Sequence, residues 1–217
     1  MNGETSAGFP EDHQIPREPV VTSVTRKGSE SRQVCLDDGS FFLLSADQCT
    51  DLGLREGAEI SLSALREAHA EYEASRALEK GISLIASRDH AKRELVRKLE
   101  QRGFTESSID HAIETLGEYG YIDDARFADA YVRERLRRHP EGRMALAAGL
   151  SKRGVDRAVI ERVLDDVVDA EVEHEALVRA ANKLSSDGRN PERLAAALLR
   201  RGFAPGQVWA WVRSRKT

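Results

Sequence analysis

The chain has 217 residues, enough for one or two domains; 40% of them are hydrophobic, 32% are charged and 6% are aromatic. No apolar run approaches the ~18 residues that a membrane-spanning helix needs, and two cysteines, Cys35 and Cys49, are too few for a disulfide-stapled secreted fold or an all-cysteine zinc site. The polar first residues lack the basic and apolar segments of a secretory signal, so we expect the protein in the cytoplasm.

The formal net charge of −4 conceals an uneven distribution of charge along the chain. Residues 1–75 hold 6 Lys and Arg against 14 Asp and Glu, whereas residues 76–217 hold 27 against 23. An acidic front and a basic remainder indicate two parts with different partners. The positive excess of the second part is well below that of a protein that coats DNA.

The front of the chain reads as a polar tail followed by a small β-rich module. Residues 1–19 hold three of the six prolines and show almost no hydrophobic periodicity, which predicts a disordered tail. In residues 20–62, short apolar runs alternate with turn residues. The clearest turn is Asp38-Gly39, which joins the apolar runs 32–36 and 41–44 and predicts a hairpin.

A short helix is predicted directly after the last of these runs. Ser45 has the side chain of an N-cap, and Gln48, three residues later, completes a capping box. Gly53 is expected to end this helix, and residues 58–60 could form one more strand.

Beyond residue 63 the sequence has helical periodicity and an internal repeat of about 50 residues. Each copy has two leucines four residues apart, an Arg-Gly pair, an apolar residue and two further apolar positions four residues apart. The glycines lie 51 and then 48 residues apart, so chance is a poor explanation. The copies read Leu95-x3-Leu99-x2-Arg102-Gly103-Phe104-x4-Ile109-x3-Ile113, Leu146-x3-Leu150-x2-Arg153-Gly154-Val155-x4-Ile160-x3-Leu164 and Leu194-x3-Leu198-x2-Arg201-Gly202-Phe203-x4-Val208-x3-Val212.

Each glycine is predicted to end a helix in the left-handed conformation, with the next residue packed back onto that helix. Together with a preceding helix, each copy becomes a three-helix unit. We predict a mainly α fold in which three tandem three-helix repeats form an elongated, curved molecule behind the β-rich module. The predicted divisions are a disordered tail (1–19), the β-rich module (20–62), a linker helix with repeat 1 (63–121), repeat 2 (122–169) and repeat 3 (170–217).

Several residues mark predicted helix starts and packing positions. Thr105 and Asn190 are expected as N-caps, and Pro205 as a first helical residue. Asp123-Asp124 could bind a metal ion, but capping of the next helix is the better interpretation. The aromatic side chains that bracket the junction of the first two copies are expected in the core rather than as base-stacking platforms; they are Tyr119, Tyr121, Phe127 and Tyr131.

The repeats and two local motifs resemble the RecX family of bacterial recombinase regulators. The motifs are Arg93-Glu94-Leu95-x3-Leu99-x2-Arg102-Gly103-Phe104 and Gly120-Tyr121-Ile122-Asp123-Asp124-Ala125-Arg126-Phe127-Ala128-x2-Tyr131. The resemblance covers about residues 75–217 and implies a protein without enzymatic activity or cofactor that binds the RecA-type recombinase filament on single-stranded DNA. It implies that strand exchange, ATP hydrolysis and coprotease activity are damped, within homologous recombination, DNA repair and the SOS response. Copy two departs from the pattern, because Val155 replaces the aromatic residue and Gly149 lies inside the helix.

No catalytic set stands out in the sequence. There is no Gly-rich phosphate loop, no His-Glu-x-x-His motif, and no Ser or Cys with an evident activating partner. The six histidines are scattered singly and are expected to pack or face solvent. We therefore expect no enzyme activity, no metal and no cofactor.

Basic residues are the candidates for a functional surface. A dense cluster of arginines repels itself unless a partner neutralises it, which favours binding; the alternative is helix-end cations on a solvated face, the better reading for Arg102. The candidate partner-binding residues, for a filament or for DNA, are Arg93, Arg97, Lys98, Arg102, Arg133, Arg135, Arg137, Arg138 and Arg143.

Three functions fit this pattern. The first is a monomeric modulator that lies in a groove of the recombinase filament, with single-stranded DNA contacted directly or through the filament and no membrane partner. The second is a direct DNA-binding protein that uses its three-helix units as readers. The third is an adaptor scaffold. The modest positive excess favours the first over the second.

Overall fold

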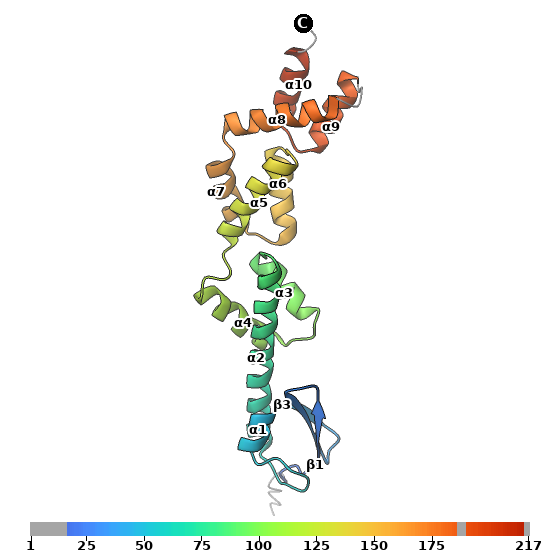
Figure 1. Cartoon of the computed structure of the whole chain (residues 1–217), viewed down its shortest axis with the longest axis vertical. Helices are drawn as coiled ribbons and strands as arrows, with labels where there is room; N and C mark the ends of the chain where they lie inside the picture. The colour runs from blue at the N-terminus through green and yellow to red at the C-terminus, as the bar shows by residue number, and fades with distance from the viewer. Residues whose placement is uncertain (1–16, 186–189, 215–217) are drawn as a thin grey trace, which may run out of the picture. The chain divides into compact units, whose positions relative to one another are not determined.

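The computed structural model describes residues 17–185 and 190–214, within which there are three β-strands and ten α-helices (Figure 1). All but the last three residues of the predicted disordered tail lie outside this part. The chain divides into two units, Met1–Glu73 and Ala74–Thr217. The mainly helical fold with a small sheet at its front confirms the predicted fold class.

The first unit contains one antiparallel sheet in the order β1-β2-β3. Its strands are β1 (Val21–Lys27), β2 (Ser31–Leu36) and β3 (Phe41–Ser45). The predicted hairpin at Asp38-Gly39 joins β2 to β3, and Gly39 adopts a φ of 84°, which a turn at this position requires. Residues 58–60 do not form a further strand, because only Glu59 bridges to Val20 before the next helix begins at Leu62.

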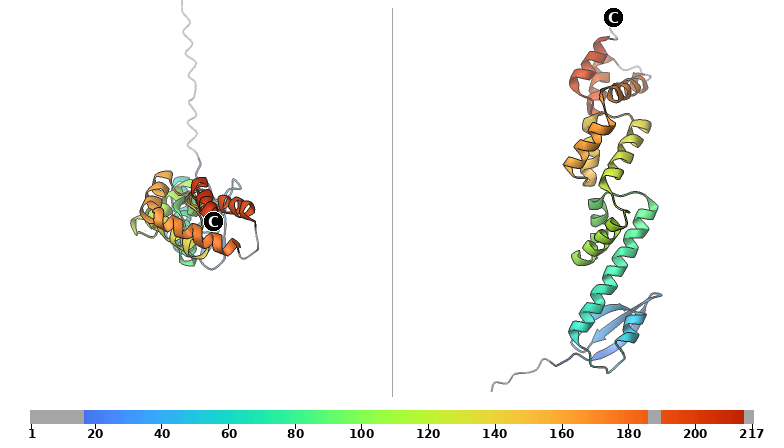
Figure 2. Two further views of the ribbon diagram at one scale, coloured as in Figure 1. Left: turned by 90° about the horizontal axis from the view of Figure 1, so that it is seen from above. Right: turned by 90° about the vertical axis from the view of Figure 1, so that its left-hand side faces the viewer.

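Helix α1 (Ala46–Asp51) begins with the predicted capping box. The Ser45 hydroxyl accepts from the Gln48 amide, and the Gln48 side chain accepts from the Ser45 amide, each at 3.0 Å. Helix α2 (Leu62–Ser87) lies beside the sheet with its first turns, as the right-hand view of Figure 2 shows. Leu65 of α2 is fully buried together with Val34 and Leu44 of the sheet, so these turns complete the core of the first unit.

The second unit contains three consecutive groups of three helices. The first group comprises the later turns of α2, α3 (Lys92–Glu100) and α4 (Glu106–Glu118). The second comprises α5 (Asp124–Arg138), α6 (Arg143–Arg153) and α7 (Arg157–Val167). The third comprises α8 (Ala170–Ser185), α9 (Pro191–Arg200) and α10 (Pro205–Ser214). We call these groups copy one, copy two and copy three.

The second helix of each copy ends at or shortly before the glycine that the sequence predicts. Gly103, Gly154 and Gly202 have φ values of 82°, 87° and 79°, the left-handed conformation expected of cap glycines. In copies two and three the amide after the glycine donates back to a leucine carbonyl, from Val155 to Leu150 and from Phe203 to Leu198. These Schellman-type bonds turn the chain into the third helix of each copy.

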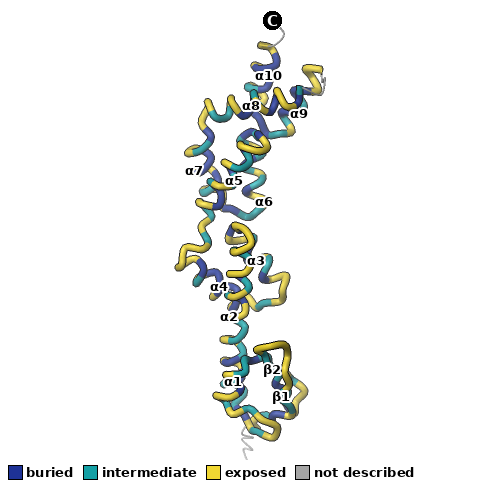
Figure 3. Tube along the Cα trace, in the orientation of Figure 1, coloured by how far each residue is buried: buried dark blue, intermediate teal, exposed yellow. Residues whose placement is uncertain are grey.

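Copy one has its own small core, whereas copies two and three share a larger one. Figure 3 shows in dark blue where buried residues lie along the helices. The copy-one core is built on Leu95 and Leu99 of α3 and on apolar residues of α4. Gly149 of α6 is explained by Tyr131, because a Cβ at position 149 would lie 2.1 Å from the Tyr131 hydroxyl. The glycine that departs from the repeat pattern thus makes room for an aromatic side chain of the same copy.

The expectation for the aromatic residues between copies one and two is half correct. Phe127 is buried and its ring stacks on that of Tyr131, with centroids 6.4 Å apart. Tyr119 and Tyr121 are 73% and 56% exposed, so placing them in the core was wrong. The turn at Gly120, with a φ of 68°, takes both residues off the apolar face of α4.

Candidate partner-binding surface

The candidate basic residues lie in two regions of the second unit. Arg93, Arg97 and Lys98 belong to α3, which is followed by Arg102 at its end. The remaining five come from the last turns of α5 and the start of α6. The two regions differ in how their charges are partnered.

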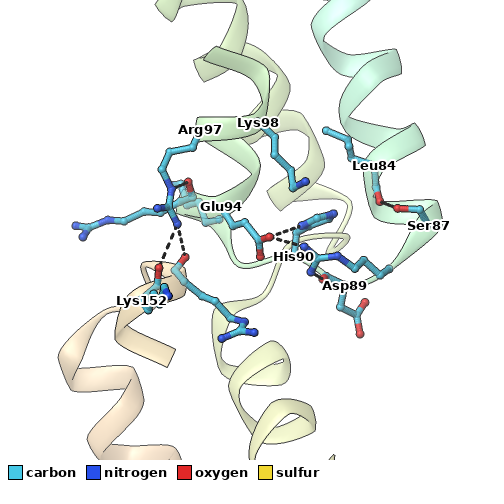
Figure 4. Close-up of polar contacts among 12 residues, drawn as sticks. Leu84, Ser87, Asp89, His90, Glu94, Arg97, Lys98 and Lys152 are labelled. Carbon is cyan, nitrogen blue, oxygen red and sulfur yellow. Dashed lines mark hydrogen bonds and ion pairs between the residues drawn. The ribbon is translucent and has the colours of Figure 1, made fainter. Parts of the chain in front are cut away.

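Arg97 of α3 joins copy one to copy two. Its guanidinium donates to the backbone carbonyls of Lys152 and Arg153 at 3.4 and 3.3 Å, and to that of Arg93 at 3.3 Å (Figure 4). The first two carbonyls belong to the last turn of α6, where the helix dipole places partial negative charge. Arg97 therefore stabilises the end of a helix in the next copy.

Two further contacts fix this junction. A Cβ at Gly154 would lie 2.6 Å from the Cβ of Arg93, so the cap glycine of copy two lies directly against α3. The Lys92 amide donates to the Asp124 carboxylate at 2.7 Å, which ties the start of α3 to the start of α5. Asp123 acts as the predicted N-cap of α5, and hydrogen bonds from the Arg126 and Ala125 amides hold its carboxyl pKa below the usual value.

The junction brings basic residues of two copies together without acidic partners. Within the part of the chain that the structure describes, no ion pair involves Arg93, Arg97, Lys98 or Lys152. Arg93, Arg97 and Lys152 are exposed. We call Arg93, Arg97 and Lys152 the junction cations.

The arginines of α5 and α6, in contrast, are neutralised inside the chain. The pairs are Arg133 with Asp129 at 2.8 Å, Arg137 with Glu134 at 2.7 Å, Arg138 with Glu134 at 2.5 Å, Arg135 with Glu141, and Arg143 with Asp165. The hydrogen bond from Arg137 holds the pKa of Glu134 below its usual value. These ion pairs relieve the repulsion among the arginines, so the density of positive charge is no longer a reason to expect a partner here. A binding role for these arginines stays a prediction.

These five arginines also differ in exposure. The side chains of Arg133, Arg137 and Arg138 are more than 60% exposed, whereas those of Arg135 and Arg143 are 35% exposed. Exposed ion pairs contribute only about 0–1 kcal/mol to stability, so a partner can replace the intramolecular acid at little cost. The three exposed arginines are therefore available to a partner, and the other two support the corner between α5 and α6.

Arg102 lies in different surroundings from the junction cations. Its guanidinium donates to the Lys98 carbonyl at 2.6 Å, as expected of a cation at a helix C-terminus. It also borders a pocket of about 510 Å³ together with Phe104 and residues of α2. As a basic residue Arg102 was grouped with the other candidates; its surroundings differ from theirs, and a binding role for it stays a prediction.

A buried polar group lies between α2 and α3. The His90 side chain is 1% exposed, and its Nδ1 is 3.4 Å from the Glu94 carboxylate, which also pairs with Arg88 (Figure 4). Burial, with repulsion from Arg88, lowers the pKa of His90, whereas the hydrogen bond and charge of Arg88 keep the pKa of Glu94 low in spite of its burial. His90 is thus neutral at pH 7 and has a packing role.

Neither a metal cluster nor a membrane span is present in residues 17–185 and 190–214. No group of three or more His, Cys, Asp or Glu there could hold a metal ion. No helix in those ranges is long and apolar enough to cross a bilayer.

Sequence reasoning missed Lys152 as a candidate. It lies two residues before the cap glycine of copy two, where the pattern predicted only a helix end. The repeat pattern does not mark it, because only the packing of Gly154 on α3 brings the end of α6 to Arg97. That packing depends on contacts between copies, which local periodicity does not reveal.

Comparisons with known proteins agree on one family. Family models described as the first and second three-helix domains of RecX match residues 77–116 and 123–164. Regulatory protein RecX of Halorhodospira halophila is 38% identical over 152 residues, which cover 67% of this chain and 91% of that protein. Regulatory protein RecX of Chlorobium phaeobacteroides is 32% identical over 135 residues, 62% of this chain and 89% of that protein.

Solved structures show the same fold. A crystal structure of regulatory protein RecX matches with a TM-score of 0.63 at 18% identity, covering 90% of this chain and 99% of that one. The crystal structure of RecX from Lactobacillus salivarius matches with a TM-score of 0.59 at 21% identity, covering 65% and 96%. With its three-helix copies and these relatives, the chain belongs to the RecX family of regulatory proteins.

Proposed function

We propose that this protein regulates a RecA-type recombinase by binding its filament on single-stranded DNA. In this account it lies in a groove of the filament and inhibits strand exchange, ATP hydrolysis and coprotease activity. The relatives are named as regulatory proteins, which supports a regulatory role. The observation that carries the proposal is the set of junction cations, Arg93, Arg97 and Lys152, exposed and without acidic partners among the described residues.

The construction of the junction supports binding to a large, ordered partner. Arg97 is held by two carbonyls of α6, and Gly154 lies against Arg93, so the two helix segments that carry the junction cations are docked on each other. Cations on a backbone that is already ordered cost less entropy to bind than cations on a flexible segment. A surface ordered in this way favours a partner with regularly placed acidic groups over a flexible chain.

Direct binding to DNA is the second candidate. The exposed pair Tyr119 and Tyr121, with ring centroids 6.2 Å apart, offers faces on which bases could stack. The small positive excess of residues 76–217 argues against this candidate, because binding to nucleic acid alone draws on many phosphate contacts.

The proposal is tested by inhibition of strand exchange. The double substitution Arg93→Glu and Lys152→Glu should raise the concentration needed for half inhibition by about 10-fold or more, because both charges face the partner. Arg157→Glu is the matched control, since Arg157 is an exposed helix residue already paired with Glu161. Equal inhibition by wild type and the double variant would contradict the assignment of this surface. A wild-type protein that leaves strand exchange untouched would contradict the function.

A further inference from the structure

The two internal junctions of the second unit are built in the same way. In each, the first amide of the earlier copy's second helix donates to a carboxylate of the next copy. Lys92 donates to Asp124 at 2.7 Å, and Arg143 donates to Glu173 at 3.3 Å. The repeat in sequence is therefore also a repeat of docking contacts.

The cap glycine of the later copy completes each junction. A Cβ at Gly154 would lie 2.6 Å from the Arg93 Cβ, and a Cβ at Gly202 would lie 2.2 Å from the Ala145 amide nitrogen. Both contacts fall on the first turn of a second helix, in α3 and in α6. The end that carries the cap glycine is thus a docking face for the preceding copy.

Copy three shows what this docking face binds. The amides of Gly142 and Met144, at the start of α6, donate to the carbonyls of Arg201 and Gly202 at 2.8 and 3.2 Å. The Arg179 guanidinium donates to the Leu136 carbonyl, at the end of α5, at 2.8 Å. The face therefore binds a helix corner, the place where one helix ends and the next begins.

Within the second unit, no described residue occupies the equivalent face of copy one. A Cβ at Gly103 would meet nothing within 4 Å, and Gly103 is exposed where Gly202 is buried. Phe104 is half-buried, whereas its counterparts Val155 and Phe203 are buried. A pocket of about 510 Å³ opens there, lined by Arg76, Glu79, Lys80, Ser83, Arg102 and Phe104.

Basic residues in the pocket set the chemistry of its occupant. Lys80 lies 23 residues before the cap glycine of its copy, the same spacing at which Arg179 precedes Gly202 and binds a helix end. Arg76 is paired with Glu79 at 3.2 Å, which leaves Lys80 and Arg102 as the excess charge. Lys80 and Arg102 can bind a helix corner in two ways. The carbonyls at the end of its first helix can accept hydrogen bonds from these cations, and acidic side chains, which are favoured in the first turn of a helix, can pair with their charges.

We propose that the open cap, formed by Lys80, Ser83, Arg102, Gly103 and Phe104, binds an acidic helix corner of a partner protein. The inference rests on the proposed function in taking this partner to be a recombinase subunit. A second copy of the chain fits less well. The second helix of copy three, α9, begins with Pro191, which has no amide hydrogen to donate where Lys92 and Arg143 donate in the internal junctions.

Binding of the full chain to recombinase filaments on single-stranded DNA tests the inference. Lys80→Glu should weaken binding about 10-fold by reversing the charge that faces the corner, and Ser83→Trp should do so by filling the pocket. Arg157→Glu makes a charge reversal on an exposed helix away from the pocket and should leave binding within about two-fold. Thermal unfolding of each variant shows that the repeats stay intact.

A photo-cross-linker at position 83 identifies the occupant. We expect p-benzoylphenylalanine in place of Ser83 to cross-link to a recombinase peptide that joins two helices. If neither Lys80→Glu nor Ser83→Trp changes binding to the filament, the open cap is not the binding site, and only this inference is overturned. A wild type that does not bind filaments would overturn the proposed function and this inference together. A cross-link to a second copy would overturn the choice of partner.

Discussion

His90 is the buried ionisable side chain that ties the stability of copy one to pH. The folded chain lowers its pKa below 6.5 through burial and repulsion from Arg88 and Lys98, with Glu94 acting in the opposite direction. The unfolded chain therefore binds a proton more readily, so the stability contribution is complete well above pH 6.5 and is lost as the pH falls through that value. Glu94 adds to the loss only below its unfolded pKa of 4.5.

We predict a falling melting temperature between about pH 7.5 and pH 5, where His90 titrates in the unfolded chain and carboxylates do not. His90→Gln should flatten this dependence, because the neutral amide has no proton to bind. Circular dichroism melts at constant ionic strength provide the measurement. A melting temperature that rises on acidification in this window would contradict the assignment.

The cap glycines differ in what surrounds them, although they have the same backbone conformation. At Gly103 alanine meets only the strain of the left-handed region, about 1–2 kcal/mol. At Gly202 it also collides with the backbone of Ala145. Gly202→Ala should therefore reduce the free energy of unfolding more than Gly103→Ala does. At position 103 itself, Gly103→Val should reduce it more than Gly103→Ala does. Urea titrations measure both differences. Equal losses at positions 103 and 202 would mean that Gly202 is not a docking contact.

Features of a single helix could be predicted from the sequence when they depend on side chains a few residues apart. The cap glycines, the capping box at Ser45 and Gln48, and Pro205 at a helix start follow from side chains a few residues apart, and the structure has all of them. The pairing of Arg133 with Asp129 is also local, one turn along α5, and could have been inferred from spacing.

Contacts between copies could not be predicted in this way. Lys152 meets Arg97 because of how two copies pack, and no period in the sequence encodes that packing. The exposure of Tyr119 and Tyr121 has a different cause, since α4 ends at Glu118 and the chain turns at Gly120, so helical spacing does not apply to these two residues. Helical spacing therefore predicts burial only for residues that lie within the helix.

The paired arginines of α5 give a prediction at this scale. Charge reversal at Arg133, Arg137 and Arg138 should slow filament binding several-fold at low salt, since exposed charges mainly steer association. Above about 0.5 M salt the difference should disappear as screening removes that steering. Association rates at several salt concentrations measure this effect. A loss that persists at high salt would instead show direct, desolvated contact by these arginines.

At the scale of the whole molecule, the unit boundary at Glu73 and Ala74 suggests how to divide the chain. A cut at residue 63 would leave Leu65 and Ala68 of α2 without the sheet that buries them. The cores of the three copies include no described residue of the first unit. Residues 74–217 should therefore unfold cooperatively and still inhibit strand exchange, as denaturation and exchange assays can show. A fragment that unfolds without cooperativity would mean that the sheet completes the repeats.

The most direct test of the account compares equilibrium binding to recombinase-coated and to bare single-stranded DNA over a range of salt concentrations. If the protein binds the filament, we expect clearly tighter binding to the coated DNA, which is lost on combining Arg93→Glu with Lys152→Glu. The salt dependence should be shallow, because few phosphates are contacted. Equal affinity for bare DNA, with a steep salt dependence reduced in the same variant, would contradict this account and identify the junction cations as a DNA-binding surface.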